Sequence, residues 1–314
     1  MAQQNLPTSP IEVNQLKSQS ILFAAFVLSA LCTTAHGQIF VTIAPGGANG
    51  TIGEYTTSGA TINASLITGL ADPDGIAVSG SNIFVVNNAT QSIGEYTTSG
   101  ATVNATLISG LNNPFEIAVS GDKLFVTTAT GVGEYTTSGA TVNASLITGF
   151  NFPTAIAVSG TSLFVGGGGI SDTIREYTTS GVLVNDSLIS TSGLPTGLAV
   201  SGSDMFFTHY YLGTISQYTT SGATVNDSLV TGLPEPNGIA VYGGHLFVAN
   251  EFSGTIGEYT TSGVPINTSL VTGLGFFAVD IAVVPEPSTW AMLVTGTMFL
   301  IFRRFLRRGL GPRS

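Results

Sequence analysis

Short apolar stretches alternate with turn residues along almost the whole interior of the chain. From Gly75 onward, four stretches rich in Val, Ile, Thr, Tyr and Phe are separated by Ser-Gly or Asn-Asn pairs, and no helical periodicity interrupts them. This pattern is typical of short antiparallel β-strands joined by tight turns. The strands expected in this segment are 76–78, 83–86, 93–97 and 103–109.

The same four-strand unit recurs six times. Each copy carries a Tyr-Thr-Thr-Ser-Gly run, and successive tyrosines of these runs are 41, 39, 42, 41 and 41 residues apart. A β-rich repeat of this length predicts either the blades of a propeller or the coils of a solenoid. The six marker tyrosines are Tyr55, Tyr96, Tyr135, Tyr177, Tyr218 and Tyr259.

The two ends of the repeat array favour the propeller. The first unit begins at 39–41 without an opening strand, and the last segment, 279–284, supplies only an opening strand. A closed ring explains both ends, because one C-terminal strand completes the blade that three N-terminal strands begin. A solenoid would instead need distinct caps. We therefore predict an all-β, six-bladed propeller of four-stranded blades over residues 38–284, closed by a shared (1+3) blade.

One repeat resembles the NHL-repeat family. Residues 236–241 read Pro-Asn-Gly-Ile-Ala-Val, 245–250 read His-Leu-Phe-Val-Ala-Asn, and 255–259 read Thr-Ile-Gly-Glu-Tyr, followed by Gly263. The resemblance covers about 39–284. It implies the propeller fold but says little about activity, because one fold serves many functions.

The N-terminal end has the parts of a secretory signal peptide. An apolar run at 21–31 follows Lys17, and Ala35 and Gly37 are small residues at the −3 and −1 positions of a cleavage site. The run is too short to span a bilayer in the final structure. We therefore expect residues 1–37 to be a signal peptide, whose removal would leave the exported domain without a cysteine.

The C-terminal end, 285–314, has three parts in order. A Pro-Glu-Pro motif precedes an apolar stretch at 291–302, which is followed by a cluster of arginines. Arginines after an apolar run stop translocation and stay on the cytoplasmic side, so a transmembrane helix is expected here. The motif comprises Pro285, Glu286 and Pro287, and the basic stop-transfer cluster comprises Arg303, Arg304, Arg307 and Arg308.

This tail resembles the PEP-CTERM sorting signal of Gram-negative bacteria, which is also described as the C-terminal domain of ice-binding proteins. The resemblance implies that an exosortase-type enzyme reads the Pro-Glu-Pro motif while the apolar segment holds the precursor transiently in the inner membrane. The exported domain would then reach the cell surface or the extracellular matrix, where extracellular polysaccharide is a candidate partner. A plain membrane anchor is the alternative interpretation.

The charge of the expected propeller excludes one class of partner. Residues 38–284 contain 16 acidic side chains and only two basic ones, Lys123 and Arg175, a net charge of −14. A surface of this sign has no cationic groove to neutralise phosphates, so nucleic acid is excluded as a partner. It also disfavours adhesion to anionic lipid.

The loops of the expected propeller differ between its two faces. Connections between first and second strands, and between third and fourth strands, lie on one face and are monotonous here. The other connections differ from blade to blade, and function usually resides on such loops, so this face and the channel mouth are the candidate ligand face. Its candidate residues are His209, Tyr210, Tyr211, Glu251, Phe252, Asp72 and Asp74.

The candidate chemistry on this face is sparse. Asp72, Asp74, Glu235 and Glu251 could converge on Ca²⁺ as oxygen ligands, but scattered acids are common in an acidic protein. His209, beside two tyrosines, is a candidate contact for a carbohydrate ring, with ordinary loop packing as the alternative. We therefore assign no metal, cofactor or catalytic residue and expect no enzyme.

Two further sets of polar residues have simple explanations. His245 follows two glycines and is expected to be a solvated turn residue. Each repeat also carries an Asn-X-Ser/Thr triplet, which is a candidate glycosylation site or simply the start of the outer strand of each blade. The asparagines are Asn63, Asn104, Asn143, Asn185, Asn226 and Asn267.

Three classes of function remain. The first is an exported, non-enzymatic binding or structural propeller, sorted by an exosortase and displayed at the cell surface or in the extracellular matrix. The second is a hydrolase or lactonase with a metal site at the channel mouth. The third is an ice- or surface-binding protein that uses the repeated threonines, although radial blades do not place these threonines on one plane.

Overall fold

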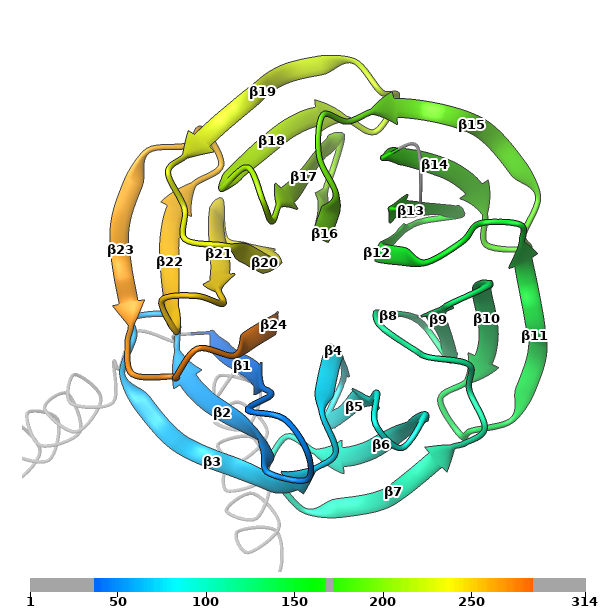
Figure 1. Ribbon diagram of the computed structural model, residues 1–314, viewed down its shortest axis with the longest axis vertical. Helices are drawn as coiled ribbons and strands as arrows, with labels where there is room; N and C mark the ends of the chain where they lie inside the picture. The colour runs from blue at the N-terminus through cyan, green and yellow to red at the C-terminus, as the bar shows by residue number, and fades with distance from the viewer. Residues whose placement is uncertain (1–36, 168–171, 285–314) are drawn as a thin grey trace, which may run out of the picture. The chain divides into compact units, whose positions relative to one another are not determined.

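Six four-stranded antiparallel sheets form a closed ring in the computed structural model, which describes residues 37–167 and 172–284 (Figure 1). The predicted six-bladed β-propeller is thereby confirmed. The predicted signal peptide, sorting motif, transmembrane segment and basic cluster lie outside the described residues, apart from Gly37. Within the described ranges, no helix has the length and apolar character to cross a membrane.

Each blade has an inner, a second, a third and an outer strand. From blade 1 to blade 6, the inner strands are β24 (Ala278–Val284), β4 (Pro73–Ser79), β8 (Ile117–Ser120), β12 (Pro153–Ser159), β16 (Pro195–Ser201) and β20 (Pro236–Tyr242). The second strands are β1 (Gln38–Ile43), β5 (Asn82–Asn87), β9 (Lys123–Thr128), β13 (Ser162–Gly167), β17 (Asp204–His209) and β21 (His245–Asn250).

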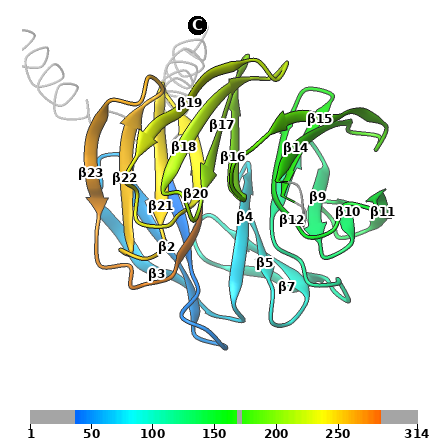
Figure 2. The same ribbon diagram turned by 45° about the horizontal axis from the view of Figure 1, so that its top comes forward.

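The two remaining strands complete each blade outward. The third strands are β2 (Gly50–Thr56), β6 (Ser92–Thr97), β10 (Gly131–Thr136), β14 (Thr173–Thr178), β18 (Thr214–Thr219) and β22 (Thr255–Thr260). The outer strands are β3 (Thr61–Leu70), β7 (Thr102–Ile108), β11 (Thr141–Thr148), β15 (Leu183–Ser190), β19 (Thr224–Thr231) and β23 (Pro265–Val271). Figure 2 shows the blades standing around the central axis.

The second strands are the most apolar because both of their faces pack against other blades. Each contributes a fully buried phenylalanine at its third position, and the hydrophobic clusters combine side chains of adjacent blades. Truncating one such ring to alanine would cost roughly 3–5 kcal/mol of stability. The six phenylalanines are Phe40, Phe84, Phe125, Phe164, Phe206 and Phe247.

A polar pair ties the second strand of every blade to the third. The first residue of the second strand contacts an acidic or amide side chain of the third, which explains the glutamate in the Gly-Glu-Tyr run. In blade 5 the roles are reversed, since Gln217 Nε2 donates to Asp204 Oδ1 at 3.2 Å. The pair therefore recurs although the residue types change. The other five pairs are Gln38–Glu54, Asn82–Glu95, Lys123–Glu134, Ser162–Glu176 and His245–Glu258.

Glycines of the Thr-Thr-Ser-Gly turns let adjacent blades approach closely. Gly59 has a φ of +85°, and a Cβ there would lie 2.4 Å from the carbonyl oxygen of Leu270. The equivalent contact recurs at every junction, for example between Gly100 and Leu66. Because Leu270 belongs to blade 6 and Gly59 to blade 1, the contact also closes the ring.

The shared blade closes the ring as predicted. Strand β24 pairs with β1 in antiparallel register, with Val283 opposite Ile39 and Ile281 opposite Val41. Ile281 is buried against blade 6 side chains, and Thr42 Oγ1 accepts a hydrogen bond of 2.9 Å from the backbone N–H of Asp280. The C-terminal strand is therefore an integral part of blade 1.

Candidate ligand site at the channel mouth

The inner strands all begin on one face of the ring, which we call the mouth face. The same face carries the inter-blade connections and the loops between second and third strands. Each inner strand places its first residues around the central axis there (Figure 1). When the inner strands are aligned by their first residues, the second position is Asp74 in β4, Asn237 in β20 and Val279 in β24.

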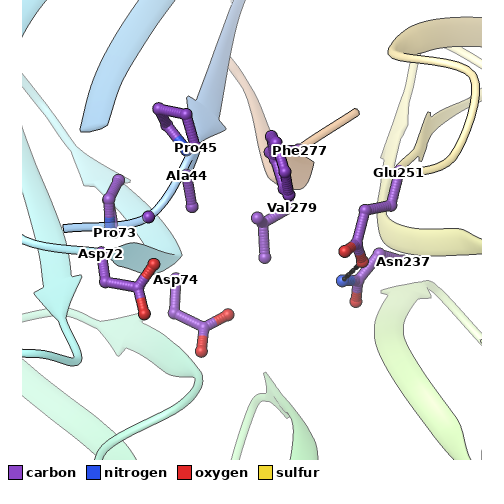
Figure 3. Close-up of a pocket in the computed structure, with 10 residues that line it drawn as sticks. Ala44, Pro45, Asp72, Pro73, Asp74, Asn237, Glu251, Phe277 and Val279 are labelled. Atoms are coloured by element: carbon purple, nitrogen blue, oxygen red, sulfur yellow. Dashed lines mark hydrogen bonds between the residues drawn. The ribbon is translucent and has the colours of Figure 1, made fainter. Parts of the chain in front are cut away.

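A pocket of about 400 Å³ opens at this mouth over blades 6, 1 and 2. Figure 3 shows the carboxylates of Asp72 and Asp74 on one side, and Glu251 with Asn237 on the opposite side. Asn237 Nδ2 donates a hydrogen bond of 3.0 Å to Glu251 Oε2. The pocket is lined by Ala44, Pro45, Gly46, Asp72, Pro73, Asp74, Asn237, Glu251, Phe277 and Val279.

Two more carboxyl groups lie next to the pocket, at the position that follows Asp74, Asn237 and Val279 when the inner strands are aligned. Glu116 precedes β8 and Asp280 lies in β24, and both replace the small residue found at this position in the other blades. The intervening inner strand has Gly75 here, and a Cβ at this glycine would lie 2.8 Å from Glu116 Oε2. The missing side chain leaves room for Glu116 and Asp280 to hydrogen-bond to each other.

Asp74, Glu116 and Asp280 form a carboxyl cluster, and burial raises the pKa of each of them. Desolvation is the main cause for Asp74, followed by the charges of Asp280, Asp72 and Glu251, and its pKa rises to about 8. The pKa of Asp280 rises to about 6, because burial outweighs the hydrogen bonds from the backbone N–H groups of Ile76 and Ile281. Burial and the neighbouring acids also hold the pKa of Glu116 well above its usual range.

Aromatic side chains on the mouth face surround this acidic centre, and we call them the aromatic rim. The exposed members are Phe152, Tyr211, Phe252, Phe276 and Phe277, whereas the other large exposed apolar side chains are aliphatic. They form pairs: Phe252 with Phe276 at 5.8 Å between ring centroids, Tyr211 with Tyr210 at 5.1 Å, and Phe152 with Phe115 at 6.3 Å.

Hydrogen bonds connect the rim to the pocket. Tyr210 donates a hydrogen bond of 2.9 Å to Glu235 Oε2 and also contacts the Glu251 carboxyl. Burial, with the two glutamates, raises the pKa of the Tyr210 hydroxyl. Burial likewise raises the pKa of Glu251. The structure therefore places six of the seven predicted ligand-face residues in the pocket or on the aromatic rim: Asp72, Asp74, Tyr210, Tyr211, Glu251 and Phe252.

His209, the seventh, lies in the core and not on the ligand face. Its side chain packs edge-on against Phe207 at 5.0 Å and is only 2% exposed. Nδ1 lies 3.3 Å from the carbonyl oxygen of Gly193, and Nε2 lies 2.9 Å from Ser216 Oγ. Burial lowers the pKa of His209 and favours the neutral ring. Its ring therefore has no surface to offer a carbohydrate.

The contact between His209 and Ser216 does not form a catalytic triad. Ser216 is fully buried, and its hydroxyl lies 2.7 Å from the carbonyl oxygen of Asp227. The Asp227 carboxylate accepts a hydrogen bond from Tyr218 instead of orienting the histidine. A triad needs an accessible nucleophile and an acid on the far nitrogen of the histidine. These side chains instead form a buried polar network in blade 5.

The remaining predicted positions have structural roles. The His245 side chain is 40% exposed, in line with the expected solvated position, and its Nδ1 also lies 2.6 Å from Glu258 Oε1. The triplet asparagines are exposed, and each side chain accepts a hydrogen bond from the backbone N–H two residues later, as from Ser65 to Asn63 at 3.1 Å. This bond lies at the bulge where the third and outer strands change register. The asparagine therefore stabilises the bulge of each blade.

A metal centre is not evident in the described part of the chain, where no group of three or more His, Cys, Asp or Glu side chains is arranged to hold an ion. Glu235 contacts Tyr210, and Glu251 lies across the pocket from Asp72 and Asp74 (Figure 3). The four acids considered from the sequence thus do not gather around one point.

Comparison with known proteins identifies the fold. No protein-family model matches the sequence. No curated protein matches it significantly. Among solved structures, one neighbour is a chain of a nidogen/laminin complex, with 15% identity over 79% of this chain and 97% of that chain and a TM-score of 0.68. Another is a gluconolactonase from Xanthomonas campestris, with 12% identity over 66% of this chain and 78% of that chain and a TM-score of 0.56.

At these identities the similarity shows the fold alone. The chain is a six-bladed, all-β propeller. Its neighbours include a propeller crystallised in a protein complex and a lactonase. The function of the chain therefore depends on its own side chains, above all those of the mouth face.

Proposed function

We propose that residues 38–284 form an exported, non-enzymatic binding module that uses the mouth face to hold an extracellular polysaccharide. The observation that carries the proposal is the aromatic rim, whose exposed rings all lie on this one face around a polar pocket. Exposed aromatic rings supply large contact areas for the apolar faces of a ligand, and the pocket supplies hydrogen-bonding groups. No comparable set of aromatic side chains is found elsewhere on the described residues.

The ends of the chain support export. A signal peptide over 1–37 would carry the domain across the inner membrane, and the tail over 285–314 would hold the precursor there until an exosortase-type enzyme cuts it. The mature propeller would then join the cell surface or the extracellular matrix of a Gram-negative bacterium. A propeller region with 16 acidic and only two basic residues fits a hydroxyl-rich, polymer-containing environment better than a nucleic acid or an anionic membrane.

Removing single rings of the rim should weaken binding without unfolding the propeller. We expect Phe152→Ala, Tyr211→Ala and Phe252→Ala each to reduce affinity for the extracellular polysaccharide of the producing cells roughly tenfold, which is about 1.4 kcal/mol. The measurement is co-sedimentation of the purified propeller with that polymer, with melting temperature recorded for every variant. Val103→Ala is the matched control, because Val103 is 54% exposed on outer strand β7. Equal binding by all four variants would contradict a ligand role for the rim.

Changing Glu286 should stop processing and leave the fold intact. In a host with the cognate exosortase, we expect Glu286→Ala to accumulate as a membrane-bound precursor, because the motif loses the single charge between its two prolines. The measurement is the C-terminal mass of the protein in membrane and surface fractions. Ser288→Ala, just outside the motif, is the control. If the wild-type protein keeps Ser314 at its final location, a plain membrane anchor replaces the sorting proposal.

A hydrolase is the second candidate function, and one observation favours it. Asp74 lies in the pocket with a pKa of about 8, so it is suited to exchange a proton near neutral pH. The described residues, however, contain no metal-binding group of acids and histidines, and His209 is buried. Hydrolysis of gluconolactone by the purified propeller, in the presence of Ca²⁺ or Zn²⁺ and lost in Asp74→Asn, would favour this candidate over the binding module.

The repeated threonines have no shared plane on which to bind ice. The outer strands that carry them follow the circumference of the ring (Figure 1), so Thr61 of blade 1 and Thr141 of blade 3 belong to different sides of the molecule. This geometry argues against ice binding by the repeated threonines.

A further inference from the structure

The pocket at the channel mouth has an acidic lining with no basic side chain to balance it. Asp72, Asp74 and Glu251 line it, and no basic side chain does. The two basic residues of the described propeller are engaged elsewhere: Lys123 pairs with Glu134 at 2.6 Å, and Arg175 pairs with Asp186 at 3.1 Å. These pairs lie on strands β9–β10 and β14–β15, away from blades 6, 1 and 2. The pocket must therefore bind protons or a cation from outside to reduce its charge.

The carboxyl group of Asp74 differs from those of Asp280 and Glu251 because it has no hydrogen-bond donor from the protein. Asp280 accepts a hydrogen bond of 2.8 Å from the backbone N–H of Ile76, and Glu251 accepts one from Asn237. Asp74 is half-buried, and no described residue donates a hydrogen bond to its carboxylate. The carboxylate points into the pocket (Figure 3). Partial desolvation of a carboxylate without a protein donor costs free energy, and a cationic donor bound in the pocket would offset that cost.

The size and lining of the pocket favour an organic cation over a metal ion. Its volume of about 400 Å³ is in the range of small-molecule sites and far exceeds that of a single ion. Apolar surface from Pro45, Phe277 and Val279 lies between the acidic sides (Figure 3). Asn237 also lines the pocket and offers an amide that can bond to hydroxyl groups. These features together fit a ring with apolar faces, hydroxyl groups and one positive charge.

We propose that the pocket binds an amino sugar of the extracellular polymer, with its ammonium group donating to Asp74 and its ring lying against Phe277. The inference rests on the proposed function and narrows it to polymers that carry free amino groups. Neighbouring sugar rings of the same chain would stack on the rim at Phe252 and Tyr211, whose ring pairs lie beside Glu251 and its partner Tyr210. A lysine side chain could also donate a hydrogen bond from its ammonium group to Asp74, but it has no sugar rings to stack on the aromatic pairs of the rim.

The proposal is tested with two matched oligosaccharides and two matched variants. The probes are oligomers of glucosamine and of N-acetylglucosamine of equal length, which differ in the acetyl group that removes the positive charge of the amine. Calorimetric titration at pH 7 and low salt should show at least roughly tenfold tighter binding of the free-amine oligomer. Asp74→Asn should abolish this preference and keep the fold. Asp122→Asn should retain it, since Asp122 is exposed in a turn on the opposite face and undergoes the same substitution.

Each alternative outcome has its own meaning. Equal affinity for the two oligomers, lowered equally by Phe252→Ala, would overturn the ammonium site and leave the binding function intact. A lysine-bearing peptide that binds as tightly as the free-amine oligomer would overturn the sugar as the source of the ammonium group. Absence of binding by both oligomers would also overturn the proposal, while the polymer co-sedimentation test would still decide the proposed function. Retained preference in Asp74→Asn would remove Asp74 from the site.

Discussion

Removing the closing strand β24 should destroy the stability of the propeller. A chain that ends at Leu274 lacks Ile281 and Ala278, which are buried against blade 6. Losing each large buried aliphatic side chain costs about 2–5 kcal/mol, and a typical domain has only about 5–15 kcal/mol in total. The truncation also exposes the N–H and C=O groups of β1 along Gln38–Ile43, which are a template for aggregation. We therefore expect aggregation or a fall in melting temperature of more than about 10 °C.

The control for this truncation ends at Pro285, after the complete strand. It removes only residues that follow the propeller and should melt like the untruncated mature domain. The measurement is calorimetric melting together with size-exclusion chromatography of both proteins. If the chain ending at Leu274 melted at the same temperature as the control, β24 would contribute nothing to the ring, and the observed pairing of Val283 with Ile39 would have no energetic meaning.

Much of the fold was predictable because the repeat shows the same local signals six times. The segment 279–284 was recognisable as an inner strand, and the structure extends it by only one residue, to Ala278–Val284. Turn residues and alternation are local properties, so neighbouring sequence is enough to place each strand. Closure then followed from counting strands at the two ends. The boundaries were less accurate, since β4 starts at Pro73, three residues before the predicted position 76.

The site was less predictable because its contacts join different blades. Glu116 and Asp280 lie far apart in sequence but hydrogen-bond across the glycine at position 75 of the intervening strand. Aligning the repeats would have revealed a signal, since both acids occupy a position that is glycine or alanine in the other four blades. The burial of His209 was missed for a different reason. Its position is the last of β17, which points inward at the end of a strand, whereas the sequence suggested a loop.

The polar pairs between second and third strands were also missed. Each partner looks unremarkable in sequence, because Gln38, Lys123 and His245 share only an ability to donate a hydrogen bond. The reversed pair in blade 5, with Asp204 opposite Gln217, is visible only once the strands are in register. These pairs depend on which residues face each other across two strands, and the pattern of residues along one strand does not contain that information.

The propeller should lose stability as the pH rises from about 4 to about 8. Burial raises the folded-state pKa of Asp74 to about 8 and of Asp280 to about 6, while an unfolded aspartate titrates near 4. A raised carboxyl pKa means that the folded state binds the proton more tightly than the unfolded chain does. The stabilisation is therefore complete below about pH 4 and is lost as the pH rises through the folded-state values.

The size of this effect follows from the same linkage. Each carboxyl group that stays protonated only in the folded state removes up to about 1.4 kcal/mol of stability per pH unit. Glu116 acts in the same direction as Asp74 and Asp280, since burial and these two neighbours raise its pKa. For a domain of this length, a loss of about 2–3 kcal/mol, which is below the upper limit that these groups set together, corresponds to a fall in melting temperature of roughly 5–10 °C between pH 5 and pH 8.

Replacing Asp74 by asparagine isolates its part of this pH dependence. The variant keeps the shape of the side chain but has no proton to lose, so we expect it to melt at a higher temperature than the wild type at pH 8 and at nearly the same temperature at pH 4. Calorimetric melting in a series of buffers from pH 4 to pH 9 is the measurement, with Asp122→Asn as the control that should follow the wild-type curve. A wild-type melting temperature that rises with pH, or an Asp74→Asn curve parallel to it, would show that the cluster is ionised in the folded protein without cost. In that case either hydration or a bound cation compensates the carboxylates, and elemental analysis of the purified protein for a bound cation separates the two explanations.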